Sequence, residues 1–295
     1  METRWSSLQR GAWFFLAFLL LPNPPATAET LLPLPPRQTV TASGHQIAYY
    51  EAGKGATVIL IHGLGADARH WSNNIGPLSE AHRVIAIDLL GYGHSDKPIM
   101  RYTVANFAAS LQSFMKALKI SRASLVGNSL GGWIALEFAI RHPQMVDKLV
   151  LVDAAGLAPQ VALKFPPHGL QPLSILNVRQ FFDFMQANKE FLAVDLGPNA
   201  FERHLENGDS YTIASSVAEM ATGKEFEDAK LGKVKASTLI IWGRDDALIP
   251  LSMGECLNRG ISGSSLVVLD GTGHIPMVGK PAEFNSAVEK FISSS

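Results

Sequence analysis

Six short runs rich in valine, isoleucine and leucine recur along the sequence, and they restrict the possible folds of this chain more than any other feature. They cover residues 57–63, 83–89, 123–129, 148–154, 237–243 and 265–271. Each run is apolar almost throughout, whereas a strand with one exposed face would alternate apolar and polar residues. We therefore expect buried strands that are covered on both faces.

Segments with helical periodicity separate most of these runs. In residues 103–120 the apolar residues that fall on one helical face are Val104, Phe107, Ala108, Leu111, Met115 and Leu118. Alternating strands and helices indicate βαβ units and a parallel sheet. The predicted fold class is α/β, with a mostly parallel, doubly wound sheet and an additional edge strand over residues 46–53.

One long stretch interrupts this alternation. Residues 157–232 contain no strand-like run and are rich in proline, phenylalanine and helix-like patterns. We interpret them as a helical cap inserted into a core formed by residues 29–156 and 233–295. The insertion follows a strand, so we expect the cap to lie over the carboxyl edge of the sheet, where ligands bind in open α/β folds.

The first 28 residues are typical of a cleavable export signal. Arg4 and Arg10 precede an apolar stretch over residues 11–21, and the small residues ending at Ala28 form an A-x-A cleavage pattern. A helix of that length spans about 16 Å, whereas the bilayer core is about 30 Å thick. We therefore expect a signal peptide over residues 1–28, a secreted or periplasmic protein, and no stable membrane span after cleavage.

Charge and cysteine content exclude several classes of partner. The formal net charge is −1 and no run of like charges occurs, so no nucleic-acid partner is expected. Cys256 is the single cysteine, which rules out an intramolecular disulfide and a cysteine-based zinc site. The sequence implies no metal and no cofactor.

Ser129 stands in the segment "LVGNSLGG", between a strand-like run and a helix-like run. The pattern Gly127-x-Ser129-x-Gly131 is that of a nucleophile elbow, in which small neighbours allow a sharp turn around a strained serine. The flanking segments provide the strand, turn and helix that such an elbow requires. We therefore expect Ser129 to be a nucleophile.

A serine hydroxyl needs a base to take its proton, and that base needs a carboxylate to orient it. His274 follows the run at 265–271, and two aspartates, Asp245 and Asp246, follow the run at 237–243. The developing oxyanion also needs two backbone N–H donors. We expect these from Leu130, directly after the serine, and from Leu64, in the loop after the first run.

Five motifs occur in the order and approximate spacing of the α/β-hydrolase superfamily: "HGLG", "DLLGYGHSD", "GNSLGG", "WGRDDALIP" and "GTGHIP". The chain resembles the capped branch of that superfamily, which includes esterases, lipases and carbon–carbon hydrolases of meta-cleavage products, over residues 38–291. The resemblance implies that Ser129 is the nucleophile and His274 the base. It also implies that the acid is Asp246, because the family's acid stands three residues after the glycine of the W-G-x-x-D segment.

The resemblance bears less directly on the bond that is cleaved. A serine at position 129 disfavours haloalkane dehalogenases and epoxide hydrolases, which attack with an aspartate. Asn128 is similar to the carbon–carbon hydrolases, but Ile275 stands where those enzymes typically carry tryptophan, and Arg179 and Arg203 match their cap arginine only loosely. The main prediction is an exported serine hydrolase that cleaves small apolar carboxylic esters through an acyl-enzyme.

The alternatives are a carbon–carbon bond hydrolase of the meta-cleavage type, a cofactor-free haloperoxidase or acyltransferase, and a non-catalytic binding protein on the same fold. For the substrate pocket we predict lining by Trp71, Asn128, Phe181 and Ile275. Several polar residues are instead interpreted as structural. These are His62, which we expect to brace its own loop, the loop residues Asp88, His94, Ser95 and Asp96, and Asp153, although some hydrolases carry the acid at its position.

Overall fold

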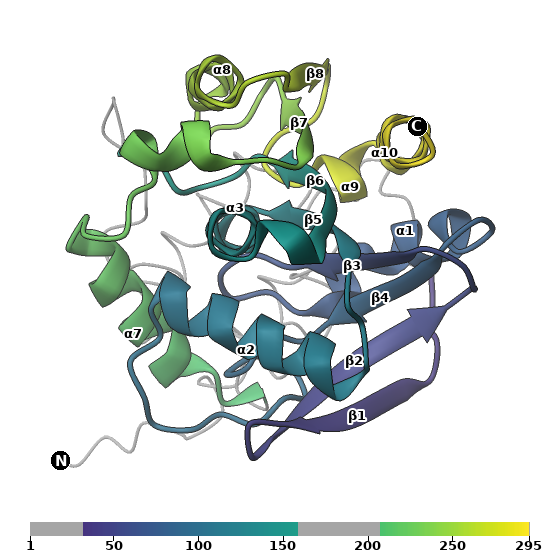
Figure 1. Cartoon of the computed structure of the whole chain (residues 1–295), viewed down its shortest axis with the longest axis vertical. Helices are drawn as coiled ribbons and strands as arrows, with labels where there is room; N and C mark the ends of the chain where they lie inside the picture. Colours follow the sequence, from purple (N-terminus) through teal and green to yellow (C-terminus); the bar gives the residue numbers. More distant parts are fainter. Residues whose placement is uncertain (1–31, 159–206, 295) are drawn as a thin grey trace, which may run out of the picture.

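The computed structural model describes residues 32–158 and 207–294, and these form an eight-stranded sheet flanked by helices (Figure 1). The strand order is β1-β2-β4-β3-β5-β6-β7-β8, and every pair from β4 to β8 is parallel. This confirms the predicted fold class. The strands are β1 (Arg37–Ala42), β2 (His45–Ala52), β3 (Thr57–Ile61), β4 (Arg83–Ile87), β5 (Ala123–Asn128), β6 (Val146–Val152), β7 (Ser237–Gly243) and β8 (Ser265–Leu269).

The edge strand predicted over residues 46–53 forms as β2, but its place at the edge is wrong. An antiparallel strand, β1, precedes it and occupies that edge. Ser43 and Gly44 connect the two with φ of 50° and 83°, and two left-handed residues in succession suit a tight hairpin. A Ser-Gly pair between two alternating segments is the signal that could have revealed this hairpin.

Helices cover both faces of the sheet, as Figure 1 shows. One face carries α2 (Val104–Ala117), α3 (Leu130–Arg141) and α8 (Leu251–Gly260), and the other carries α1 (Ser72–Leu78), α9 (Pro276–Gly279) and α10 (Pro281–Ile292). Short 3₁₀ helices lie at Ala68–Trp71, Pro143–Met145 and Asp228–Lys233.

The two covered faces explain why the strands are apolar throughout. In β3, Ile59 and Ile61 pack into the cluster under α2 and α3, while Val58 and Leu60 pack into the cluster under α1 and α10. Successive side chains of a strand point to opposite faces, so a strand covered twice needs apolar residues at every position.

Part of the predicted cap lies within the described residues. Helix α7 (Ser210–Ala221) packs beside the segment before α2: the Tyr211 hydroxyl donates to Met100 O, and Tyr102 N–H donates to Ser215 Oγ. At the base of the insertion, Glu227 N–H donates to Gly156 O at 2.8 Å, so the chain returns to the core beside its point of departure. Residues 159–206 and the predicted signal peptide lie outside the described residues.

Within the described ranges, no helix combines the length and the apolar character needed to cross a membrane.

Candidate active site

Ser129 is the single residue between the end of β5 at Asn128 and the start of α3 at Leu130. Its backbone has φ 56° and ψ −119°, a conformation that side-chain-bearing residues rarely adopt. The turn is held because Ser129 N–H donates to Val152 O at 3.0 Å, while Ala155 N–H donates to Ser129 O at 3.1 Å. Every residue from 123 to 139 is buried except Ser129, which is partly exposed. The strained turn therefore leaves the Ser129 side chain partly exposed, while its neighbours in the chain are buried.

The glycines of the elbow are required by packing. A Cβ on Gly127 would lie 2.2 Å from Gly131 O, and a Cβ on Gly131 would lie 2.2 Å from Ile61 O. Side chains at these positions would push β5, α3 and β3 apart. The turn predicted around Gly127 and Gly131 thus depends on close backbone contact, as the motif suggested.

The predicted oxyanion donors lie on two segments that meet at Ser129. Leu130 is the first residue of α3, where backbone N–H groups lack partners within the helix. Leu64 follows Gly63, and a Cβ on Gly63 would lie only 3.1 Å from Ser129 Cβ. The loop after β3 therefore packs directly against the serine.

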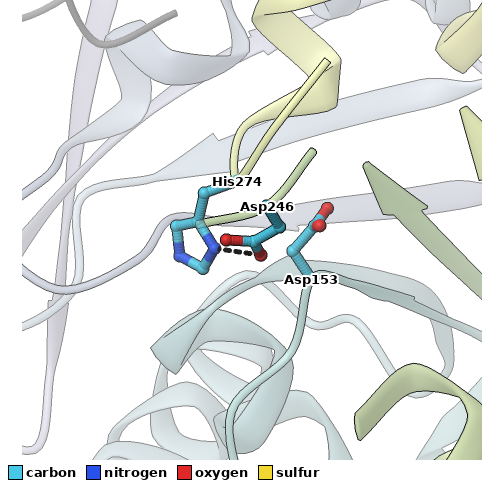
Figure 2. A group of neighbouring side chains, drawn as sticks. All are labelled: Asp153, Asp246 and His274. Carbon is cyan, nitrogen blue, oxygen red and sulfur yellow. Dashed lines mark hydrogen bonds and ion pairs between the residues drawn. The ribbon is translucent and has the colours of Figure 1, made fainter. Parts of the chain in front are cut away.

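His274 and Asp246 form a buried pair at the same edge of the sheet (Figure 2). His274 Nδ1 lies 2.7 Å from Asp246 Oδ2, and both side chains are almost fully buried. Asp246 Oδ1 accepts the N–H groups of Leu248 and Ile249 at 2.8 and 2.9 Å, which fixes the carboxylate in place. Asp245, the other aspartate in this loop, is exposed.

Asn128 connects the turn at Ser129 to the loop that carries His274. Its Nδ2 donates to His274 O at 3.0 Å and to Val152 O at 3.2 Å. The side chain is buried, so one amide links segments that are 146 residues apart in the chain. The backbones of residues 128 and 274 consequently lie side by side.

Asp153 lies close to the Asp246–His274 pair at this edge of the sheet. One oxygen of Asp153, one of Asp246 and a ring nitrogen of His274 all lie within 4.8 Å of one another. Among the described residues this is the group whose donor atoms could hold a metal ion, but Nδ1 of His274 is already engaged by Asp246. The sequence prediction did not place Asp153 next to the pair, although its position directly after β6 was the available signal.

His62 braces its loop, as predicted. Leu89 N–H donates to His62 Nε2 at 3.0 Å, and His62 Nδ1 lies 2.8 Å from Gly63 O. Since Nε2 accepts, Nδ1 must carry the proton and donate. Burial lowers the pKa of His62 to about 4, which keeps the imidazole neutral in this role.

The loop after β4 is also held as predicted. Asp88 accepts Ala68 N–H and His94 N–H, one on each carboxylate oxygen, both at 2.9 Å. Ser95 Oγ donates to Asp88 O, and Asp96 Oδ2 accepts Gln46 N–H. Burial raises the pKa of Asp88 to about 6 despite these donors. Asp88 therefore links the loop after β3, which carries Ala68, to the loop after β4, which carries His94.

Three of the four residues predicted to line the pocket, Trp71, Asn128 and Ile275, are buried. Trp71 and Ile275 are both buried in the apolar cluster on the α1 and α10 face, where Trp71 packs against Phe284 with ring centroids 6.1 Å apart. Phe181 lies outside the described residues, as do Arg179 and Arg203. The pocket lining stays a prediction.

Comparison with known proteins places this geometry in a family context. The model of the family described as "alpha/beta hydrolase fold" matches residues 56–281. Among curated proteins, the 2-hydroxy-6-oxo-6-phenylhexa-2,4-dienoate hydrolase of Comamonas testosteroni is 34% identical over 262 residues, covering 83% of this chain and 91% of that protein.

Two solved structures illustrate the range of similar proteins. A meta-cleavage product hydrolase from Pseudomonas fluorescens IP01 is 30% identical with a TM-score of 0.77, covering 86% of this chain and 96% of the other. A membrane phospholipase A, described as a bacterial virulence factor, is 31% identical with the same TM-score of 0.77, covering 87% of this chain and 85% of the other.

Proposed function

The chain belongs to the α/β hydrolase fold family, and from that premise we propose that it is a hydrolase in which Ser129 is the nucleophile, His274 the base and Asp246 the acid. The observation that carries this proposal is the buried His274–Asp246 pair, 2.7 Å apart. Asn128 bonds the backbone of His274 to the residue preceding Ser129. The nucleophile and the base thus belong to adjacent segments.

The proposed chemistry begins with attack of Ser129 Oγ on a substrate carbonyl carbon. His274 takes the hydroxyl proton at Nε2, while Asp246 on Nδ1 holds the required tautomer and stabilises the imidazolium. The N–H groups of Leu64 and Leu130 receive the negative charge on the carbonyl oxygen. The intermediate then collapses: the bond between the carbonyl carbon and the leaving group breaks, the leaving group takes the proton from the His274 imidazolium, and an acyl-enzyme on Ser129 remains. Neutral His274 activates water, which cleaves the acyl-enzyme, releases the acid product and restores the Ser129 hydroxyl.

For the cleaved bond we propose a carbon–carbon bond next to a ketone, in a conjugated diketone of the meta-cleavage class. Curated relatives that are 34% and 33% identical to this chain are named as hydrolases of such compounds. The leaving group in this reaction is a carbanion, so the conjugated second carbonyl must accept its electron pair. Asn128 in "GNSLGG" is also the residue typical of that branch.

Ester hydrolysis is the second candidate. The phospholipase A structure is as similar to this chain in fold and identity as the meta-cleavage hydrolase is. Ile275 after the proposed base, where the carbon–carbon hydrolases carry tryptophan, also favours this alternative. Export after Ala28 would suit an ester substrate better than an intracellular degradation product.

A direct competition of substrates tests the proposal. Turnover of 2-hydroxy-6-oxo-6-phenylhexa-2,4-dienoate and of p-nitrophenyl butyrate is measured for the wild type, for Ser129→Ala and for Ser124→Ala, a control in the same strand. We expect kcat/KM on the dienoate to be at least about tenfold the ester value, and Ser129→Ala to lose about 10³-fold or more.

The outcomes separate the alternatives. A faster ester reaction that still requires Ser129 would favour the esterase. Equal activity of Ser129→Ala and the wild type on both substrates would refute the assignment of the nucleophile.

A further inference from the structure

Asp153 lies beside the proposed catalytic pair although the proposed mechanism gives it no role. It directly follows β6, and its side chain is fully buried. One of its carboxylate oxygens lies within 4.8 Å of an Asp246 oxygen and of a His274 ring nitrogen. Figure 2 shows the three side chains adjacent to one another, with Asp246 bonded to His274. The imidazole therefore has two buried carboxylates within a short distance.

The local structure explains why a short polar residue stands at position 153. The backbone has φ 44°, a left-handed conformation that aspartate and asparagine tolerate better than most residues. Asp153 Oδ1 accepts Gly243 N–H at 2.9 Å, and Asp153 N–H donates to Ile241 O at 3.0 Å. These bonds hold the ends of β6 and β7 together. Asparagine would satisfy the same backbone and the same acceptor, so neither requirement calls for a charge.

A charge at this position is costly in the resting protein. Burial disfavours an ionised carboxylate, and a second carboxylate nearby disfavours it further. Asp246 already receives two backbone N–H groups and the imidazole. The positive charge that forms on His274 during turnover is the event that would offset the cost of a second carboxylate.

We propose that Asp153 is a second carboxylate that positions His274. It stabilises the imidazolium from within 4.8 Å of a ring nitrogen, and it orients the ring when the Asp246 carboxylate has been removed. This inference rests on the proposed function, because it assigns His274 the part of the base. Asp153 acts through the imidazole and makes no contact with substrate.

The test compares Asp153→Asn, Asp246→Asn and the double variant on whichever substrate the wild type turns over. Asp153→Asn keeps the acceptor for Gly243 and the left-handed backbone while it removes the charge. We expect kcat to fall about 3- to 10-fold with KM unchanged. The acid limb of the kcat/KM profile should also move to lower pH, because a charge that favours the imidazolium is gone.

The double variant tests whether Asp153 supports His274 when the Asp246 carboxylate is absent. Asp246→Asn alone should lose about 10³- to 10⁴-fold in kcat, and the additional Asp153→Asn should lower the remaining rate about tenfold more. A double variant as fast as Asp246→Asn, or an acid limb unmoved by Asp153→Asn, would overturn the inference. Asp153→Ser, a second short and neutral replacement, should give the same shift of the acid limb if Asp153→Asn does not fold.

The experiment also separates this inference from the proposed function. Ser129-dependent turnover and labelling of wild-type Ser129 by a fluorophosphonate test the function by themselves. If both hold and the Asp153 variants behave as the wild type does, the function stands and the role of Asp153 is refuted. A merely structural Asp153 would change thermal stability or KM but leave the acid limb in place.

Discussion

The imidazole of His62 accepts the backbone N–H of Leu89 at Nε2, across 3.0 Å, and thereby fixes its own proton on Nδ1. That proton bonds to Gly63 O, one residue before the proposed oxyanion donor Leu64. A second proton on this ring would remove the acceptor for Leu89 and place a charge in a fully buried site. The loop after β3 therefore depends on a neutral His62.

This dependence predicts a loss of stability in acid. Burial lowers the folded-state pKa of His62 to about 4, from 6.5. The unfolded chain therefore binds the proton first, and the contribution of His62, complete above pH 6.5, is lost as the pH falls toward 4. Between pH 7 and pH 5 the free energy of unfolding should fall by about 2 kcal/mol through this group.

Urea unfolding of the wild type and His62→Gln at the two pH values measures this effect. The glutamine variant does not titrate there, so its deficit relative to the wild type should narrow by about 2 kcal/mol at pH 5. A deficit that stays the same at both pH values would show that His62 is not the responsible group.

Close packing of the elbow predicts a large effect at Gly131. A Cβ there would lie 2.2 Å from Ile61 O and 2.5 Å from His62 O, so Gly131→Ala must separate α3 from β3. We expect a loss of about 3 kcal/mol or more in unfolding free energy, together with loss of activity. The matched control is Gly232→Ala in the 3₁₀ helix Asp228–Lys233, where a Cβ meets nothing within 4 Å and alanine should change the unfolding free energy by less than about 1 kcal/mol. Equal effects of the two substitutions would contradict the packing argument.

The strands could be predicted because of how β3 to β7 are buried. Ile59 and Leu60 point to opposite, equally covered faces, so the run is apolar throughout and stands out in the sequence. The edge strand β1 was missed because most of its residues are exposed and it pairs on one side only. Its formation depends on the Ser43-Gly44 turn, a weaker signal than apolar content.

The candidate site was predictable to the extent that it follows from strand direction. Parallel strands bring their carboxyl ends to one edge, and Ser129, Asp246 and His274 each follow such an end, those of β5, β7 and β8. Two contacts were not accessible to that reasoning. The distance between Asp153 and Asp246 depends on β6 and β7 being neighbours, and the bond from Asn128 to His274 O depends on the exact path of a loop.

A second pH effect is predicted at the base of the insertion. Glu227 is fully buried beside Glu137 of α3, and Lys230 Nζ lies 2.9 Å from Glu227 and 4.0 Å from Glu137. Arg141 also pairs with Glu137. Burial, followed by the hydrogen bond with Glu137, raises the pKa of Glu227 to about 7. Glu227 therefore retains part of a proton at neutral pH, whereas the same carboxyl group in the unfolded chain is ionised.

The folded-state pKa of Glu227 is raised from 4.5, so stability falls as the pH rises from 4.5 through 7. Glu227→Gln keeps a neutral side chain at every pH. We expect its melting temperature to exceed that of the wild type by about 3 °C at pH 8.5, with a smaller difference at pH 6. Glu255→Gln, an exposed change in α8, is the control. A wild type that melts above Glu227→Gln at pH 8.5 would reverse the predicted sign.

The two hydrogen bonds of Asn128 predict unequal effects of two substitutions. Asn128→Ala removes the donor to His274 O and Val152 O, and we expect kcat to fall about tenfold as the histidine loop loosens. Asn128→Asp also places a carboxylate against both carbonyl oxygens, so the loss should reach about 100-fold. Asn106→Asp makes the same chemical change on an exposed residue that donates to Arg101 O, and it should leave kcat unchanged. Equal losses for the two Asn128 variants, with KM raised in both, would instead indicate that Asn128 acts by contacting the substrate.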